Sequence, residues 1–166
     1  MVNPKPGTEH YTELLSKLKN GYMQLPKFRR DFVWSTDKTA SLLDSIIRGF
    51  PIGTFILWRT DQRLPNAKQL GNLDIPQPPK HIPIDYILDG QQRLASLLAA
   101  VEGLTINVPD TTKTIDYKEF YVNLEIDPDA NFDNDLVTAK PPDVDTLHQI
   151  RVYELLNVNL FDLFNK

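Results

Sequence analysis

Apolar residues recur along three segments of the chain with the spacing that places them on one face of an α-helix. They fall at i, i+3, i+4 and i+7 in each segment: Tyr11, Leu14, Leu15 and Leu18; Leu43, Ile46, Ile47 and Phe50; and Leu94, Leu97, Leu98 and Val101. A glycine follows each segment, at Gly21, Gly49 and Gly103, and glycine is common just after the last helical turn. The sequence therefore predicts three amphipathic helices, each with one buried stripe.

Shorter apolar runs with strand character lie at residues 54–58, 86–88 and 120–126, and the last of them alternates apolar and polar residues. The order is helix, helix, strand, strand, helix, strand. One strand leads directly into a helix through the turn Asp89-Gly90. This order predicts an α/β (α+β) domain with a small mixed sheet flanked by helices.

Two proline-containing stretches, residues 61–83 and 127–145, show neither a helical nor a strand period and predict loops. Apolar residues crowd the last nine positions, which indicates either that this segment docks back onto the domain or that the chain is the front of a longer protein. We favour the second. The chain then divides into a core, residues 1–126, and an acidic loop with a carboxyl-terminal segment, residues 127–166, that leads towards a further domain.

Composition limits the classes of protein that the chain can belong to. Hydrophobic residues make up 41% and charged residues 24%, as in soluble globular domains. The longest apolar run, Leu97 to Val101, is far shorter than the roughly 20 residues of a membrane-spanning helix. The absence of cysteine excludes a disulfide framework, a thiol nucleophile and a cysteine-ligated metal. The start of the chain has no apolar leader, so we expect a cytoplasmic protein.

The net charge of −4 is unevenly distributed. Residues 1–60 hold nine Lys/Arg and five Asp/Glu, a balance of +4, whereas residues 61–166 hold nine and seventeen, a balance of −8. A domain that gripped duplex nucleic acid over most of its surface would be basic throughout. The chain can offer a local basic face, or its acidic loops simply keep it in solution.

The most informative stretch is Asp89-Gly90-Gln91-Gln92-Arg93, which follows an apolar strand and opens a helix. The first turn of a helix carries unpaired backbone N–H groups and the positive end of the helix dipole, which together attract anions. Gly90 lets a bulky anion approach the backbone, and Arg93 presents a fork of donors that suits phosphate oxygens. Gln91 and Gln92 add neutral donors, and Asp89 is suited to hold Mg²⁺ or to position a water molecule.

The same stretch has a plainer interpretation. An Asp-Gly turn before a helix is also a simple capped turn, with Asp89 near the N-cap and the amides facing solvent. The spacing of the residues leaves both interpretations open.

Two further stretches are candidates for ligand contacts. Just before the second helix, cations alternate with aromatic rings: Lys27, Phe28, Arg29, Arg30, Phe32 and Trp34. Such a segment can hold phosphate through a cation while a ring stacks on a base, or the rings can be core anchors with the cations in water. The stretch Gly49-Phe50-Pro51-Ile52-Gly53 predicts a rigid turn between a helix and a strand, with or without a ligand.

Other chemistries have less support. His10, His81 and His148 lie far apart, and none has a metal-ligand partner at a useful spacing. The acidic residues at 127–133 alternate as in a calcium loop, but the central glycine and the closing glutamate are absent. We expect that segment to be a solvated loop.

Together the three stretches resemble the GmrSD-type restriction endonuclease N-terminal domain family. Pro-x-Phe-x-Arg-x-Phe-Val-Trp at residues 26–34, Pro51-Ile52-Gly53 and Asp-Gly-Gln-Gln-Arg at residues 89–93 occur in the order of that family. Arg30 matches the arginine of the first motif, and Arg29 stands where the family commonly has glutamine. The resemblance extends from about residue 10 to residue 126.

The resemblance implies a ParB/sulfiredoxin-like fold at the front end of a larger bacterial anti-phage protein that restricts modified DNA. It also implies that the domain binds and hydrolyses a nucleoside triphosphate at residues 89–93, with a nuclease domain in the same chain or in a partner chain. No nuclease motif occurs within the 166 residues, so we do not expect this chain alone to cut DNA.

The sequence and the resemblance thus predict an Mg²⁺-dependent NTPase domain. The residues expected to take part in catalysis are Asp89, Arg93 and Arg30, and those expected to bind the nucleotide are Gly90, Gln91, Gln92, Arg93, Arg30, Pro51, Ile52 and Gly53. One alternative is a non-catalytic module that binds a nucleotide or DNA and controls a separate nuclease domain. Another is a domain that keeps the fold but has an inactive site and serves regulation or assembly.

Overall fold

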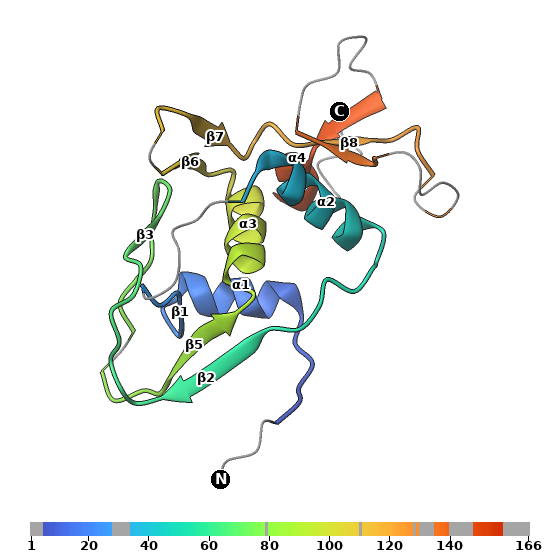
Figure 1. Ribbon diagram of the computed structural model, residues 1–166. Coiled ribbons are helices and arrows are strands. Elements are labelled where there is room, and N and C mark those ends of the chain that lie inside the picture. The colour runs from blue at the N-terminus through green and yellow to red at the C-terminus, as the bar shows by residue number, and fades with distance from the viewer. Residues whose placement is uncertain are drawn as a thin grey trace.

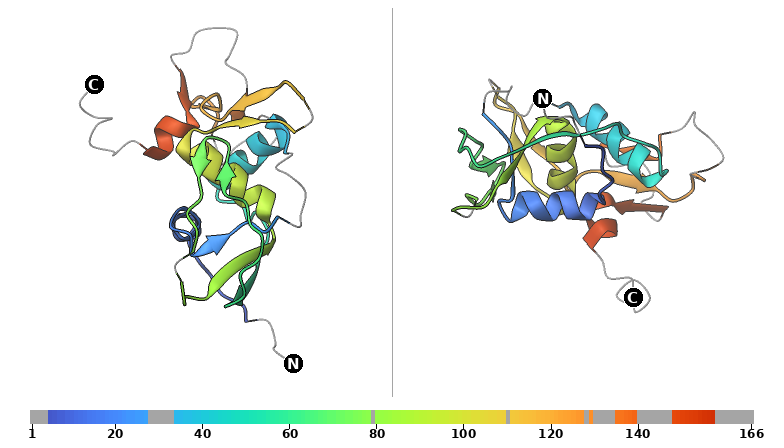
Figure 2. Two further views of the ribbon diagram at one scale, coloured as in Figure 1. Left: turned by 90° about the vertical axis from the view of Figure 1, so that its left-hand side faces the viewer. Right: turned by 90° about the horizontal axis from the view of Figure 1, so that it is seen from below.

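The computed structural model describes residues 5–27, 34–78, 80–109, 111–127, 129, 135–139 and 148–157. Helix α3 (Gln91–Glu102) runs between two small three-stranded sheets (Figure 1). Figure 2 shows the same arrangement from two further sides, with helices α1 (Tyr11–Lys19) and α2 (Thr36–Ile47) packed against α3. This combination of helices and small sheets confirms the α+β class. The ParB/sulfiredoxin-like assignment stays a prediction.

The three predicted helices are confirmed, and each buries one apolar stripe. α1 buries Leu14, Leu15 and Leu18, and the buried side of α3 includes Leu94, Leu97 and Leu98. These stripes meet in one hydrophobic core. Each lies within one continuous segment, so helical periodicity in the sequence was sufficient to predict it. Within the described residues, no helix is long and apolar enough to cross a membrane.

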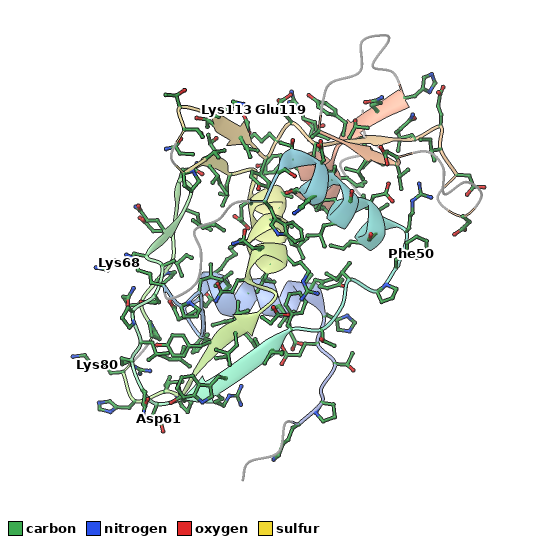
Figure 3. All side chains as sticks on the ribbon, in the orientation of Figure 1. Phe50, Asp61, Lys68, Lys80, Lys113 and Glu119 are labelled. Atoms are coloured by element: carbon green, nitrogen blue, oxygen red, sulfur yellow. The ribbon has the colours of Figure 1, made fainter. Side chains whose placement is uncertain are left out.

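The second helix ends earlier than the apolar spacing predicted. α2 stops at Ile47, Arg48 is its C-cap, and Gly49 has a left-handed backbone with φ of +73°. Phe50 therefore lies beyond the helix, on the connection to the first sheet, and is 41% exposed (Figure 3). The prediction that Phe50 completes a buried stripe is wrong, because a residue with positive φ cannot continue a right-handed helix.

The mixed sheet predicted from the sequence is confirmed. Its order is β1 (Met23–Gln24), β5 (Ile84–Asp89) and β2 (Ile56–Thr60), with β1 parallel and β2 antiparallel to the central β5. Leu57 and Ile87, which are register partners, belong to the hydrophobic core together with the helices. The sheet thus holds the end of β5 and the start of α3 in a fixed relation.

A second sheet and two hairpins contain the remaining strands of the described residues. The strands are β3 (Gln69–Leu70) with β4 (Leu73–Asp74), β6 (Thr105–Asn107) with β7 (Thr114–Asp116), and β8 (Tyr121–Asn123) between β9 (Val137–Thr138) and β10 (Gln149–Arg151). The prediction of loops throughout 61–83 and 127–145 is therefore wrong at β3, β4 and β9. Strands of two residues are too short to show a period.

Helix α4 (Val152–Asn157) follows β10 and packs on the core. The Val152 amide donates to the Phe120 carbonyl at 2.8 Å, and the Asn157 amide group donates to the Val101 carbonyl at 2.5 Å. Residues 148–157 thus rest on the part of the chain before residue 126. The apolar cluster at the carboxyl end, from Val158 onwards, lies outside the described residues.

Candidate functional site

The candidate site lies where β5 ends and α3 begins. Asp89 is the last residue of β5, and Gly90 is the N-cap of α3 with φ of +89°. Gly90 accepts the first intrahelical bond, from the Leu94 amide at 3.0 Å, and has no side chain with which to cap the helix. The N-cap is therefore Gly90 and not Asp89. The amides of the first turn have no partner within the helix itself, and the positive end of the helix dipole lies at this turn.

The polar side chains of the motif point in different directions. The Asp89 carboxylate is 54% exposed and accepts a bond of 3.3 Å from Arg93 Nη2. Gln91 turns back towards the sheet, where its Nε2 donates to the Ile87 carbonyl at 2.6 Å. Asp89 thus faces solvent beside the turn, while Gln91 fastens the start of the helix to the strand before it.

Arg93 joins the two motifs that the sequence singled out separately. Its Nη1 donates to the Ile52 carbonyl, and its Nη2 donates to the Thr54 carbonyl at 2.8 Å. The guanidinium carbon lies 5.0 Å from the centre of the Phe55 ring, and the side chain is only 19% exposed. The segment that contains Pro51, Ile52 and Gly53 is thereby brought against the Asp-Gly-Gln-Gln-Arg turn.

Two glycines make this close approach possible. Gly53 has φ of +87°, and a Cβ atom there would lie 2.5 Å from Arg93 Nη1. Gly90 has φ of +89°, and a Cβ atom there would overlap Cδ1 of Phe55. Each position therefore excludes a side chain twice, through its backbone conformation and through its neighbour.

Phe55 is a site residue that sequence reasoning missed. The sequence placed it inside a strand over residues 54–58, but β2 begins at Ile56, and the Phe55 ring lies beside both Gly90 and Arg93. A Phe in an apolar run is usually a core or strand residue, so only its position two residues after Gly53 pointed to the site.

The first motif cannot be placed relative to this site. Phe28, Arg29, Arg30 and Phe32 lie outside the described residues. Trp34, the last residue of that motif, is half-buried just before α2, where Ser35 Oγ caps the helix by accepting from the Lys38 amide at 3.4 Å. The role of Arg30 therefore rests on the resemblance.

The exposed carboxylate of Asp89 is a group that could hold a magnesium ion. Mg²⁺ in such sites takes one or two protein carboxylates and completes its shell with phosphate oxygens and water. Among the described residues, no group of three or more His, Asp or Glu side chains is arranged to hold a metal. One exposed carboxylate is thus available at this turn, and the other ligands of an Mg²⁺ ion would be phosphate oxygens and water.

The start of α3 thus combines a Gly N-cap, the exposed carboxylate of Asp89 and an arginine that is bonded to the neighbouring glycine turn. The chain matches the model of the family described as GmrSD restriction endonuclease, N-terminal domain, over residues 11–163. The chain belongs to that family.

The chain is also 29% identical, over 135 residues, to an uncharacterized protein of Methanocaldococcus jannaschii. The match covers 76% of this chain and 22% of that relative. The chain therefore corresponds to less than a quarter of the length of this curated relative.

Proposed function

We propose that this chain is the nucleoside-triphosphate-binding and hydrolysing N-terminal domain of a modification-dependent restriction system. The observation that carries the proposal is the strand–turn–helix site at residues 89–93, where helix-start amides, an exposed carboxylate and a cation gather within one turn. Helix-start amides favour phosphate oxygens for the reasons that make them a general anion site. The family to which the chain belongs is the second support.

The proposed roles are based on the positions of the described residues and, for Arg30, on the family motif. The phosphates lie at the backbone amides of Gln91, Gln92 and Arg93. Gly90 has no side chain that would block their approach to these amides. Asp89 holds the Mg²⁺ of the nucleotide or orients the attacking water. Arg30, by its match to the family motif, neutralises charge that develops on the transferred phosphoryl group.

The Pro51-Ile52-Gly53 segment forms one wall of this site. Its carbonyl at Ile52 is bonded to Arg93, so the segment is fixed beside the motif. The glycine at position 53 leaves the Arg93 guanidinium room against the backbone. In this proposal the segment shapes the space in which the nucleotide lies.

A nuclease domain in the same protein or in a partner chain would use the nucleotide state of this domain. The description of the family as part of a restriction endonuclease supports this, as does the greater length of the relative. We propose modified DNA as the target of the assembled system, with cleavage supplied by the companion domain.

The test is calorimetric titration of the purified chain with GTP, ATP and CTP in the presence of Mg²⁺, paired with a phosphate-release assay. Saturable binding with release is expected. Asp89→Asn should abolish release, and Lys113→Ala, on the distant β6–β7 hairpin (Figure 3), serves as the control with unchanged binding and release. Absence of binding to all three nucleotides would contradict the proposal.

A second candidate is a nucleotide-binding switch without turnover. It is favoured by Arg93, whose terminal nitrogens are bonded to protein oxygens instead of pointing to solvent. The same titration distinguishes the candidates, because a switch saturates with nucleotide yet releases no phosphate. A steep decrease of DNA affinity with salt would in turn indicate direct DNA contacts by the basic first sixty residues.

A further inference from the structure

We infer that Arg93 and Phe55 are a positioning pair, which fixes residues 52–54 against the first turn of α3, and that Arg93 serves the nucleotide site through this contact and not as a direct phosphate ligand. The inference rests on the proposed nucleotide site and assigns roles within it. It adds Phe55 to the site and gives Arg93 a role different from the one its sequence position suggests.

The hydrogen bonds of Arg93 are the first step. A guanidinium that grips phosphate presents two parallel N–H groups to the ligand. Here Nη1 donates to the carbonyl of Ile52, and Nη2 donates to the carbonyl of Thr54 and to Asp89. Both terminal nitrogens therefore serve oxygens of the protein, and the fork spans the segment from residue 52 to residue 54.

The Phe55 ring is the second step. Its face lies 5.0 Å from the guanidinium carbon of Arg93, within the range of a cation–π contact. Its edge lies so close to Gly90 that a Cβ there would overlap both Cδ1 and Cε1. One ring thus contacts both the turn and the arginine, and it holds the guanidinium plane in the orientation that reaches the two carbonyls.

The local sheet geometry is the third step. Ile56 pairs with Asp89 and Leu57 pairs with Ile87, so the register shifts by one residue and Leu88 is skipped. Such a bulge bends a strand and changes the direction of its side chains, and bulges often lie next to functional sites. The regular ladder ends at Leu57, and the bonds from Arg93 join the segment before Ile56 to the start of α3.

An arginine that positions the backbone and an arginine that binds phosphate respond differently to substitution by lysine. Lysine keeps the positive charge but cannot donate to two carbonyls in a plane or stack on a ring as arginine does. If Arg93 positions residues 52–54, Arg93→Lys loses as much nucleotide affinity as Arg93→Ala. If Arg93 neutralises phosphate charge, lysine restores a large part of the binding.

The experiment measures Mg²⁺-nucleotide affinity for the wild-type chain, Arg93→Lys, Arg93→Ala, Phe55→Ala, Phe55→Tyr and the double variant Phe55→Ala/Arg93→Ala. Loss of one charge-assisted bond corresponds to about a tenfold change in affinity, so we expect at least that loss for Arg93→Lys, Arg93→Ala and Phe55→Ala. Phe55→Tyr keeps the ring face and should recover most of the affinity that Phe55→Ala loses. The double variant should be no weaker than Arg93→Ala alone, because the two residues act as one unit.

The control is Ile56→Ala, which truncates the adjacent side chain of β2 and is expected to leave affinity unchanged, since that side chain is 53% exposed. Recovery of affinity in Arg93→Lys would overturn the inference. Losses in the double variant that equal the product of the single losses would also overturn it.

Amide hydrogen exchange at residues 52–55 separates this inference from the proposed function. Arg93→Lys and Phe55→Ala should accelerate exchange at these amides, while Ile56→Ala should not. If the wild-type chain binds no nucleotide, the proposed function is wrong. Hydrogen exchange alone then tests whether Arg93 and Phe55 hold residues 52–54 in place. Unchanged exchange in both variants would refute it.

Discussion

Gly90 satisfies two constraints that a residue with a side chain cannot satisfy together. Its φ of +89° is unfavourable for any other residue, and its position faces the edge of the Phe55 ring. Gly49 has a similar φ of +73°, but an added Cβ there meets nothing within 4 Å. Substitutions at these two glycines therefore separate the energetic cost of the backbone conformation from the cost of the contact with Phe55.

We expect Gly90→Ala to lower the free energy of unfolding by about 2 to 3 kcal/mol, because strain adds to overlap with the ring. Gly49→Ala should cost about 1 kcal/mol, through strain alone. Urea unfolding of both variants measures the difference. Equal losses would mean that the Phe55 ring moves aside without cost, and the packing of Phe55 on Gly90 would then contribute nothing.

Tyr117 is fully buried, near Thr39 of α2 and Ser96 of α3. Burial raises the pKa of its hydroxyl from 10.0 to about 12, while the side chains of Thr39 and Ser96 act on that pKa in the opposite direction. The folded state therefore favours the neutral form. The stability that this hydroxyl contributes is complete below pH 10 and is lost as the pH rises through about 12.

Tyr117→Phe should remove this pH dependence, because phenylalanine has no proton to lose. A shift of two pKa units corresponds to about 2 to 3 kcal/mol, so the wild type should lose that much relative to the variant on going from about pH 9 to about pH 12. The measurement is the free energy of unfolding in urea at both pH values. Parallel changes in the two proteins would show that Tyr117 is not the group responsible.

At the scale of elements, Asp44 connects helix α2 to strand β9. Its Oδ2 accepts from the Leu136 amide at 2.6 Å and from the Val137 amide at 3.2 Å, and its Oδ1 accepts from Arg48 Nε at 2.6 Å. The Arg48 side chain is 3% exposed. One carboxylate therefore satisfies two backbone groups of an edge strand and a buried cation.

We expect Asp44→Ala to destabilise the protein by about 3 kcal/mol, because it leaves the Arg48 charge buried without that carboxylate. Lys38→Ala, on an exposed position of the same helix, should change stability by less than about 0.5 kcal/mol. Urea unfolding gives both values, and hydrogen exchange at Leu136 and Val137 reports whether β9 detaches. A loss no larger than that of Lys38→Ala would contradict the role of Asp44.

The elements also show which parts of the fold can be predicted from sequence. An amphipathic helix carries its signal within one continuous segment, so residues 11–19 and 91–102 were found from spacing alone. β1 has two residues, and its partner β5 lies about sixty residues away, so its pairing leaves no local pattern. The prediction for Phe50 was wrong because the apolar spacing in the sequence continues past Gly49, whose positive φ ends the helix.

At the scale of the whole molecule, the site is assembled from segments about forty residues apart. The strand–turn–helix at residues 89–93 was predictable, because a strand, a glycine and a helix start are adjacent in the sequence. The contacts from Arg93 to Ile52 and Thr54 were not, because a carbonyl acceptor has no side-chain signature and every residue carries one. The family resemblance grouped the three motifs, and the structure shows the hydrogen bonds between the Pro51-Ile52-Gly53 segment and Arg93 of the motif at residues 89–93.

Helix α3 gives this arrangement a mechanical consequence. Its first turn lies at the site, and its last turn is tied to α4 by Asn157 and to α1 by the Lys19–Glu102 pair at 2.7 Å. Twelve residues at 1.5 Å each make a rod of about 18 Å. Because rigid elements carry displacement between distant sites, a ligand that pushes the first turn along the axis also moves the end that holds α4. If phosphates bind at this turn as proposed, a displacement of α3 along its axis would be measurable at Asn157.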